Sequence, residues 1–335
     1  MTLAKRFAPL AATLGTALAI TPLGAGAQTP PDTTPIWSLQ DENASASTSG
    51  LTDRYYVNGF RASYTSGEGD APAPLARMAQ GLWGNGAVRF SIDLSQQIDT
   101  PADTQAAKPP AGDRPYAGVL LATFGLWNDT PDTRSMVSLS LGVLGPDALA
   151  QSVQNGFHNI IGQGHTNGWH DQIGNEAVGE VTAGRTWRIP VAQFGDLETD
   201  ALPEVTGGIG NERIYAQTGF VLRIGQGLMS DYGAPRVSPG PNGGDAYTPT
   251  RPFAWYVFAG GDGQAVGWDA TINGGITGTG THITPTPLVG EAEAGLAVLA
   301  FGARLTYTQV FQSAEIPNQH GGLHQFGVLT ASIRF

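Results

Sequence analysis

Residues 323–335, at the end of the chain, read LHQFGVLTASIRF. From residue 329 onward every second side chain is apolar, and these side chains belong to Leu329, Ala331, Ile333 and Phe335. Successive side chains of an extended strand point to opposite faces, so a period of two indicates a strand. The chain is therefore expected to finish on a β-strand with one apolar face.

The same alternation recurs along the chain. Residues 299–308 place Leu299, Phe301 and Leu305 on one face, with small or polar side chains between them. Four further segments alternate in the same way, and aromatic residues mark expected strand ends. Alternating segments lie at 136–143, 88–94, 210–224 and 253–258, and aromatic residues near expected strand ends are Trp37, Tyr56, Trp127, Trp187, Trp255 and Tyr307. The pattern predicts an all-β chain built from many strands.

A membrane barrel explains these strands better than a soluble β-sandwich, although both alternate. The second face of the strands is small or polar, and aromatic residues stand where girdles would meet the membrane surface. A last strand that ends in Phe335 is similar to the terminal strand of bacterial outer-membrane proteins, which the barrel-insertion machinery recognises. We therefore expect a transmembrane antiparallel β-barrel in a bacterial outer membrane.

The first residues carry the features of a signal peptide. Lys5 and Arg6 precede the mostly apolar residues 7–23, and Ala25-Gly26-Ala27 offers a small-x-small cleavage site. An uncleaved anchor is the alternative, but Pro22 and nearby glycines interrupt the apolar run well short of about 20 residues. The expected organisation is a signal peptide over 1–27 and a single barrel domain over 28–335.

Composition excludes several other classes. The chain has no cysteine, so disulfides and thiolate metal sites are absent. No stretch after the signal peptide reaches about 18 apolar residues, which argues against a helical membrane protein. The 47 Gly and 23 Pro suit turns and loops. A net charge of −11 argues against a nucleic-acid partner, because phosphates attract Lys and Arg.

One segment departs from the strand pattern and predicts a short helix in an extracellular loop. It begins at Pro146 or Asp147 and ends at Gly162. Polar side chains share one stripe, formed by Gln151, Gln154, Asn155 and His158, and the apolar stripe beside it comprises Leu149, Val153, Phe157 and Ile160 or Ile161. The polar stripe either faces water, as on any surface helix, or lays His158 and its amides against the barrel wall.

Five ordered elements resemble the lipid A deacylase (LpxR-like) family. They are DRYYVNG at 53–59, DRPYAG at 113–118, LGVLGP at 141–146, Gln154-Asn155 with His158, and GWHDQIGNE at 168–176. The resemblance implies a barrel of about 12 strands with a site between its wall and the loop helix. It implies a calcium-dependent esterase that removes the 3′-acyloxyacyl group of lipid A, so that lipopolysaccharide is the partner.

The resemblance also implies roles for particular residues. His158 would be the general base, because imidazole accepts a proton near neutral pH, and Gln154 would orient a group beside it. Ca²⁺ prefers oxygen ligands, and the family's Asn-Asp pair falls within Asp41, Glu42 and Asn43. Strand alternation turns Glu42 inward, so Glu42 is the first candidate carboxylate and Asp41 and Asn43 are its neighbours. Glu42 and Asn43 also count among the candidate catalytic residues.

The resemblance also suggests one substrate contact, and the sequence departs from the family pattern at two positions. Lys108 stands near the position of a family lysine that could contact a lipid A phosphate. Val57 replaces an expected hydroxyl residue, and Gly164 falls where the family carries a carboxylate. The alternative is therefore a non-catalytic structural or lipopolysaccharide-binding barrel on the same scaffold. A phospholipase with a Ser nucleophile is a third reading, but no suitable Ser and His pair occurs in adjacent strand positions.

Overall fold

The computed structural model describes residues 31–47, 54–238, 243–277 and 283–335. The signal peptide expected over 1–27 lies outside these residues, as does Asp53 of the first family element. None of the described helices is long and apolar enough to cross a membrane.

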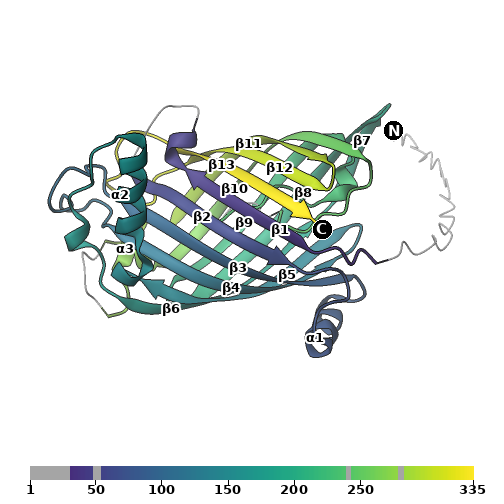
Figure 1. Ribbon diagram of the computed structural model, residues 1–335, viewed down its shortest axis with the longest axis horizontal. Coiled ribbons are helices and arrows are strands. Elements are labelled where there is room, and N and C mark those ends of the chain that lie inside the picture. Colours follow the sequence, from purple (N-terminus) through teal and green to yellow (C-terminus); the bar gives the residue numbers. More distant parts are fainter. Residues whose placement is uncertain (1–30, 48–53, 239–242, 278–282) are drawn as a thin grey trace, which may run out of the picture. The chain divides into compact units, whose positions relative to one another are not determined.

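The described residues form a closed antiparallel barrel of twelve strands (Figure 1). In chain order these are β1 (Ile36–Asn43), β2 (Tyr55–Thr65), β3 (Ala87–Thr100), β4 (Ala117–Asp129), β5 (Thr133–Leu144), β6 (Glu176–Trp187), β8 (Leu197–Gly210), β9 (Arg213–Gln226), β10 (Phe253–Asp269), β11 (Leu288–Ala300), β12 (Ala303–Gln312) and β13 (His324–Arg334). Each strand pairs with its sequence neighbour, β1 pairs with β13, and β6 pairs with β8. The all-β transmembrane barrel expected from the sequence is confirmed.

The remaining elements lie in the connections. A thirteenth strand, β7 (Ile189–Phe194), pairs only with β8. The described helices are α1 (Ala73–Trp83), α2 (Ala150–Ile161) and α3 (Ala270–Asn273), with four short 3-10 turns, η1 (Ala44–Ala46), η2 (Pro146–Ala148), η3 (Trp169–Asp171) and η4 (Leu228–Ser230). Helix α1 lies at the barrel end where Ile36 pairs with Arg334, which we call the terminal end, and α2 lies at the opposite end (Figure 1).

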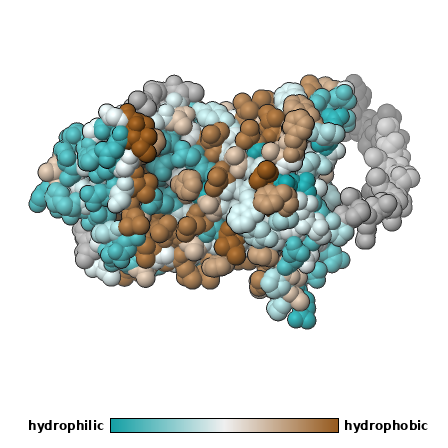
Figure 2. Space-filling model, viewed as in Figure 1, coloured by the Kyte–Doolittle hydropathy of each residue, from teal (hydrophilic) through white to brown (hydrophobic). Residues whose placement is uncertain are grey.

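Strand alternation separates a polar interior from an apolar exterior. On β1 the inward residues Gln40 and Glu42 are buried, whereas Leu39 is 58% exposed on the outer face. The exposed outward side chains of many strands share this apolar character; they include Phe60, Ile92, Leu94, Phe124, Leu141, Phe220, Leu222, Val257, Leu296, Leu305 and Leu329. Figure 2 shows apolar residues gathered across the middle of the barrel wall. This band is the surface that a barrel presents to lipid.

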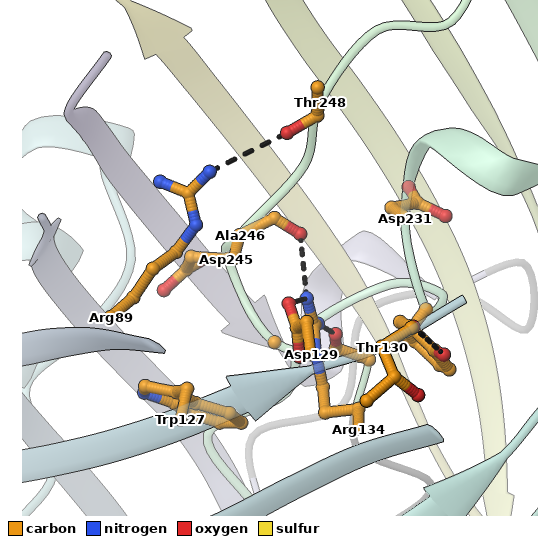
Figure 3. A network of polar contacts seen from close by, with 12 residues as sticks. Arg89, Trp127, Asp129, Thr130, Arg134, Asp231, Asp245, Ala246 and Thr248 are labelled. Carbon is orange, nitrogen blue, oxygen red and sulfur yellow. Dashed lines mark hydrogen bonds and ion pairs between the residues drawn. The ribbon is translucent and has the colours of Figure 1, made fainter. Parts of the chain in front are cut away.

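Segment 228–250, between β9 and β10, folds back into the interior of the barrel in its described parts. Arg134 of β5 donates to the carbonyl oxygen of Ala246, 3.0 Å away, and Arg89 of β3 reaches Thr248 (Figure 3). Farther along the lumen, Arg236 forms an ion pair with Glu291 of β11 at 2.7 Å. The segment therefore connects strands on several sides of the wall from within.

Asp231 is the central anion of this internal segment. Its carboxylate lies 2.7 Å from the guanidinium of Arg223 and 3.2 Å from that of Arg304, and it accepts a hydrogen bond from the hydroxyl of Tyr256. These partners belong to β9, β12 and β10. A buried charge is tolerated only when its partners satisfy it, so loss of one member leaves the others unpaired.

We predict that Asp231→Ala lowers the free energy of unfolding by about 3–5 kcal/mol, because buried guanidinium groups lose their counter-charge. Urea titration in detergent, followed by the electrophoretic shift between folded and unfolded barrel, measures this quantity. Asp196→Ala is the matched control, since Asp196 is exposed in the turn between β7 and β8. Equal stability of the two variants would contradict a central role for Asp231.

Candidate active site

Helix α2 lies against the outer wall of the barrel, across β3 and β4, at the end opposite the terminal end (Figure 1). Pro146 stands in the first turn of η2, just before the helix. The N–H groups of a first turn have no acceptor within the turn, so the missing N–H of proline loses no hydrogen bond there. Gly162 ends α2 in a left-handed conformation (φ 73°), and its N–H donates to the carbonyl oxygen of His158. The helix expected between residues 146 and 162 is present and ends where expected, but it begins at Ala150 rather than at Pro146 or Asp147, because Leu149 takes a left-handed conformation (φ 62°) between η2 and α2.

The helix approaches the wall very closely. A Cβ atom at Gly118 of β4 would lie 2.4 Å from the Cβ of Ala150, so only glycine permits this contact. The side-chain amide of Gln96 on β3 donates to the carbonyl oxygen of Ala148 at 2.5 Å. A buried apolar cluster fills the interface and comprises Val57, Ile98, Tyr116, Ala150 and Trp169. These contacts fix the rotation of α2 about its axis.

That rotation turns Gln154 and His158 of the polar stripe toward the wall, leaves Gln151 exposed, and turns the apolar stripe outward. Gln154 and His158 are only 4% and 5% exposed, whereas Phe157 is 45% and Ile160 is 82% exposed. In water this orientation would be unfavourable, but beside a lipid-facing barrel wall it buries polar groups and leaves apolar ones for the bilayer. Of the two sequence interpretations, the one that lays His158 against the wall is correct.

A pocket of about 260 Å³ lies between α2 and the outer face of β1, β2 and β3. Its apolar lining comes from both sides and comprises Val57, Phe60, Ile98, Val153, Phe157 and Ile161. Its polar lining comprises Asp41, Asn43, Ser45, Asn58, Gln154, His158 and Gln163. The pocket therefore combines an apolar surface with a small set of convergent polar groups, as ligand sites commonly do.

The ring of His158 is oriented by the backbone at Gly164. Its Nδ1 lies 2.8 Å from the carbonyl oxygen of Gly164. A carbonyl oxygen can only accept a hydrogen bond, so Nδ1 is the nitrogen that carries the proton in the neutral ring. The lone pair then belongs to Nε2, which is the nitrogen able to accept a proton. A main-chain carbonyl thus stands at the position in sequence where the family resemblance predicted a carboxylate.

Gln154 serves mainly to hold the loop that follows α2. Its side-chain oxygen accepts hydrogen bonds from Trp169 Nε1 at 2.8 Å and from the hydroxyl of Thr166 at 3.3 Å. Trp169 is fully buried and its ring packs on Tyr116, with the centroids 4.8 Å apart. Gln154 therefore couples the helix to residues 166–169 and fixes the backbone on either side of Gly164.

Glu42 lies apart from His158, inside the barrel. Its carboxylate accepts hydrogen bonds from the hydroxyl of Tyr56 at 2.7 Å and from the backbone N–H groups of Val237 and Ser238 at 2.6 and 3.1 Å. The expectation that Glu42 faces inward is correct, but the pocket is on the outer face. The ranking of Glu42 as first metal carboxylate and as a catalytic residue does not match this geometry, because alternation carries it away from His158.

Asp41 and Asn43 point to the pocket instead. Asn58 donates to the Asp41 carboxylate at 2.8 Å, and the Asn43 side-chain oxygen accepts from the N–H of Ser45 at 2.7 Å. Asn58 and Ser45 were not predicted from the sequence, since amides and hydroxyls near strand ends are common. Val57 is the extra residue of a β-bulge between Tyr56 and Asn58, which directs its side chain into the same pocket.

Few metal-ligating side chains line the pocket. Within the described residues, no group of three or more His, Asp and Glu side chains could hold a metal. The Asp41 carboxylate and the Asn43 amide are nevertheless oxygen donors of the kind that Ca²⁺ takes. None of the described lining residues is Lys or Arg. Lys108 is exposed in the loop between β3 and β4 and does not line the pocket.

Comparison with known proteins agrees with this architecture. A family described as outer membrane protein LpxR matches residues 10–335. The solved structure of LpxR from Salmonella typhimurium aligns with 90% of this chain and 100% of its own, at 20% identity and a TM-score of 0.73, which shows a shared fold. The β domain of the Bordetella autotransporter BrkA aligns with 91% of this chain and 100% of its own, at 9% identity and a TM-score of 0.43. No curated protein sequence matches. Because the family match spans nearly the whole sequence, the chain belongs to the LpxR family of outer membrane proteins.

Proposed function

We propose that this protein is an outer-membrane lipid A deacylase that hydrolyses the 3′-acyloxyacyl ester of lipid A, with His158 as general base. The observation that carries the proposal is the buried, oriented imidazole in a pocket that opens on the lipid-facing side of the barrel wall. A soluble substrate would not require a helix with its apolar stripe turned outward. A substrate that is itself a membrane lipid explains both features together.

The location suits a lipid of the outer leaflet. Outer-membrane barrels keep both termini on the periplasmic side, so the α2 end faces outward, where lipopolysaccharide is found. The pocket walls formed by Val153, Phe157 and Ile161 suit an acyl chain, since burying apolar surface is worth about 25 cal/mol per Å².

Lys108, exposed at the same end, is the proposed contact for a lipid A phosphate. Phe335 and its strand are proposed to direct insertion by the barrel-insertion machinery.

Ester hydrolysis needs an activated water and a positive group near the developing oxyanion. His158 Nε2 would accept the proton of the attacking water. The Gly164 carbonyl would keep the ring in the productive tautomer and stabilise the imidazolium through the Nδ1–H bond. Gln154 would act as a positioning residue by holding residues 166–169 against the helix.

The positive group is proposed to be Ca²⁺, held by Asp41 and Asn43. When bound, it would supply the Lewis-acid charge that no described Lys or Arg provides in the pocket lining. With the single carboxylate that the described lining offers, the affinity would be low, because the affinity of calcium sites rises with ligand charge. Asn58 would orient the Asp41 carboxylate through its amide hydrogen bond.

A non-catalytic lipopolysaccharide-binding barrel is the second candidate. Val57 favours it, because its side chain occupies the pocket without offering an oxygen to a metal or substrate. The oriented His158 favours the enzyme, since a binding protein needs no fixed tautomer.

The first prediction concerns the base. Expression in a Gram-negative host is expected to remove the 3′-acyloxyacyl mass from lipid A, and His158→Ala is expected to restore it by lowering the rate at least ~100-fold. Mass spectrometry of extracted lipid A measures the change. His170→Ala is the control, because His170 is exposed and does not line the pocket. Unchanged lipid A in cells with correctly inserted wild-type barrel would refute the enzyme and favour the binding protein.

The second prediction concerns the carbonyl at Gly164. A Cβ at this position meets no atom within 4 Å, and the backbone there is not left-handed. Because the main chain provides the acceptor for His158, Gly164→Ala should retain deacylation within a few-fold of the wild type. The same lipid A assay applies. Activity as low as that of His158→Ala would show that the carbonyl does not act as described.

The third prediction separates two neighbouring acids. Asp41→Asn should raise the Ca²⁺ concentration needed for half-maximal deacylation by roughly tenfold or more, since Asp41 is the only carboxylate among the described residues that line the pocket. Glu42→Gln should leave that concentration unchanged, because Glu42 faces the lumen. Purified protein, assayed across buffered free Ca²⁺, provides the comparison. If Glu42→Gln raised this Ca²⁺ concentration and Asp41→Asn did not, the ion would instead lie inside the barrel.

A further inference from the structure

Helix α1 covers part of the outer wall at the terminal end (Figure 1). Ala79 is fully buried and, with Ala76 and Trp83, packs on Val88 of β3 and Leu126 of β4. Val88 and Leu126 have the same strand parity as the exposed outward residues Ile92 and Phe124, so they would face lipid if α1 were absent. The helix is therefore attached to the outside of the barrel by one edge of its apolar face.

Helix α1 has a second apolar stripe, and none of the described core clusters includes its residues. Leu75, Met78 and Leu82 follow the i, i+3, i+7 spacing of one helix face, and they are 39%, 44% and 62% exposed. On the other side of the helix stand the polar residues Arg77 and Gln80, both exposed. Arg77 is the only charged residue within α1, so the helix carries a positive charge.

The outward residues of β3 show where α1 lies relative to the membrane. Val88 is buried under α1, Ile92 and Leu94 are exposed, and Ile98 is buried under α2. Val88 and Ile98 are ten positions apart. This spacing corresponds to roughly 34 Å along an antiparallel strand, or about 26 Å across a bilayer for a strand tilted by ~40°. An outer-membrane apolar band is about 25 Å tall. The two helices thus mark its two edges.

We propose that the exposed stripe Leu75, Met78 and Leu82 of α1 inserts into phospholipid at the periplasmic edge of the membrane. Along β3, Val88 under α1 is followed by the partly buried Phe90 and the exposed Ile92, so the lipid-facing wall begins beside the helix. Arg77 then reaches the phosphate level, which an anionic headgroup complements. Helix α1 anchors the barrel in depth and rotation opposite α2, independently of any catalytic activity.

Site-specific fluorescence tests this placement, and the absence of native cysteine makes single labels unique. Leu82→Cys and Gln80→Cys each receive a polarity-sensitive thiol dye after folding into vesicles of phosphatidylethanolamine and phosphatidylglycerol. Leu94→Cys, on the lipid-facing wall, calibrates the signal of a fully lipid-exposed label. None of these three residues lines the pocket under α2.

The proposal expects blue-shifted emission from the Leu82 label and loss of its fluorescence with nitroxide-labelled lipid, but little quenching by aqueous iodide. The Gln80 label is expected to be quenched strongly by iodide and only weakly by nitroxide-labelled lipid. Iodide quenching of the Leu82 label as strong as that of the Gln80 label would overturn the proposal, because the stripe would then face water. Protection of the Leu82 label from both quenchers would also overturn it, since protein rather than lipid would cover the stripe.

Discussion

The contact between the polar stripe of α2 and the outer wall of the barrel determines the rest of the candidate site. Gly118 lets the helix approach until it touches the wall, and the hydrogen bond from Gln96 to the Ala148 carbonyl fixes the η2 turn that leads into it. With that rotation set, His158 faces β1 and β2 and its apolar neighbours face lipid. A rotation of α2 by half a turn would place His158 in the bilayer, where an unsatisfied imidazole is costly.

The barrel gives this contact a rigid support. Strand closure between β1 and β13 and between β6 and β8 leaves no open edge in the wall. Inside, segment 228–250 ties strands from different sides together through Asp231, Arg236 and their partners. Glu42 belongs to this internal network through Val237 and Ser238, while Asp41 belongs to the pocket. Two adjacent residues of β1 therefore serve opposite faces of the same wall.

The sequence predicted the barrel well, because a period of two is a property of individual strands and needs no tertiary information. It also predicted the end of the loop helix, since Gly162 acts locally, but not its start at Ala150, which follows the left-handed Leu149. It did not identify the face of β1 that carries the site. Alternation correctly assigned Glu42 to the inside, but only the position of α2 on the outer wall shows that the outward residues Asp41 and Asn43 meet His158.

Other features depended on contacts that sequence pattern does not reveal. The acceptor for His158 is the main-chain carbonyl of Gly164. Every residue offers a main-chain carbonyl, so the sequence does not show which one the fold brings to the imidazole. The bulge at Val57 changes strand register without a Gly or Pro to signal it. The ion pairs of the internal segment 228–250 join residues far apart in the chain, so no local pattern reveals them.

The tautomer of His158 tests the account most directly. Side-chain ¹⁵N NMR of histidine-labelled protein in lipid, assigned by comparison with His158→Asn, reports which ring nitrogen carries the proton. The account predicts a neutral ring with the proton on Nδ1, bonded to the Gly164 carbonyl, and the lone pair on Nε2. A ring with the proton on Nε2 and the lone pair on Nδ1 would contradict it, because His158 could not then accept a proton from the pocket side.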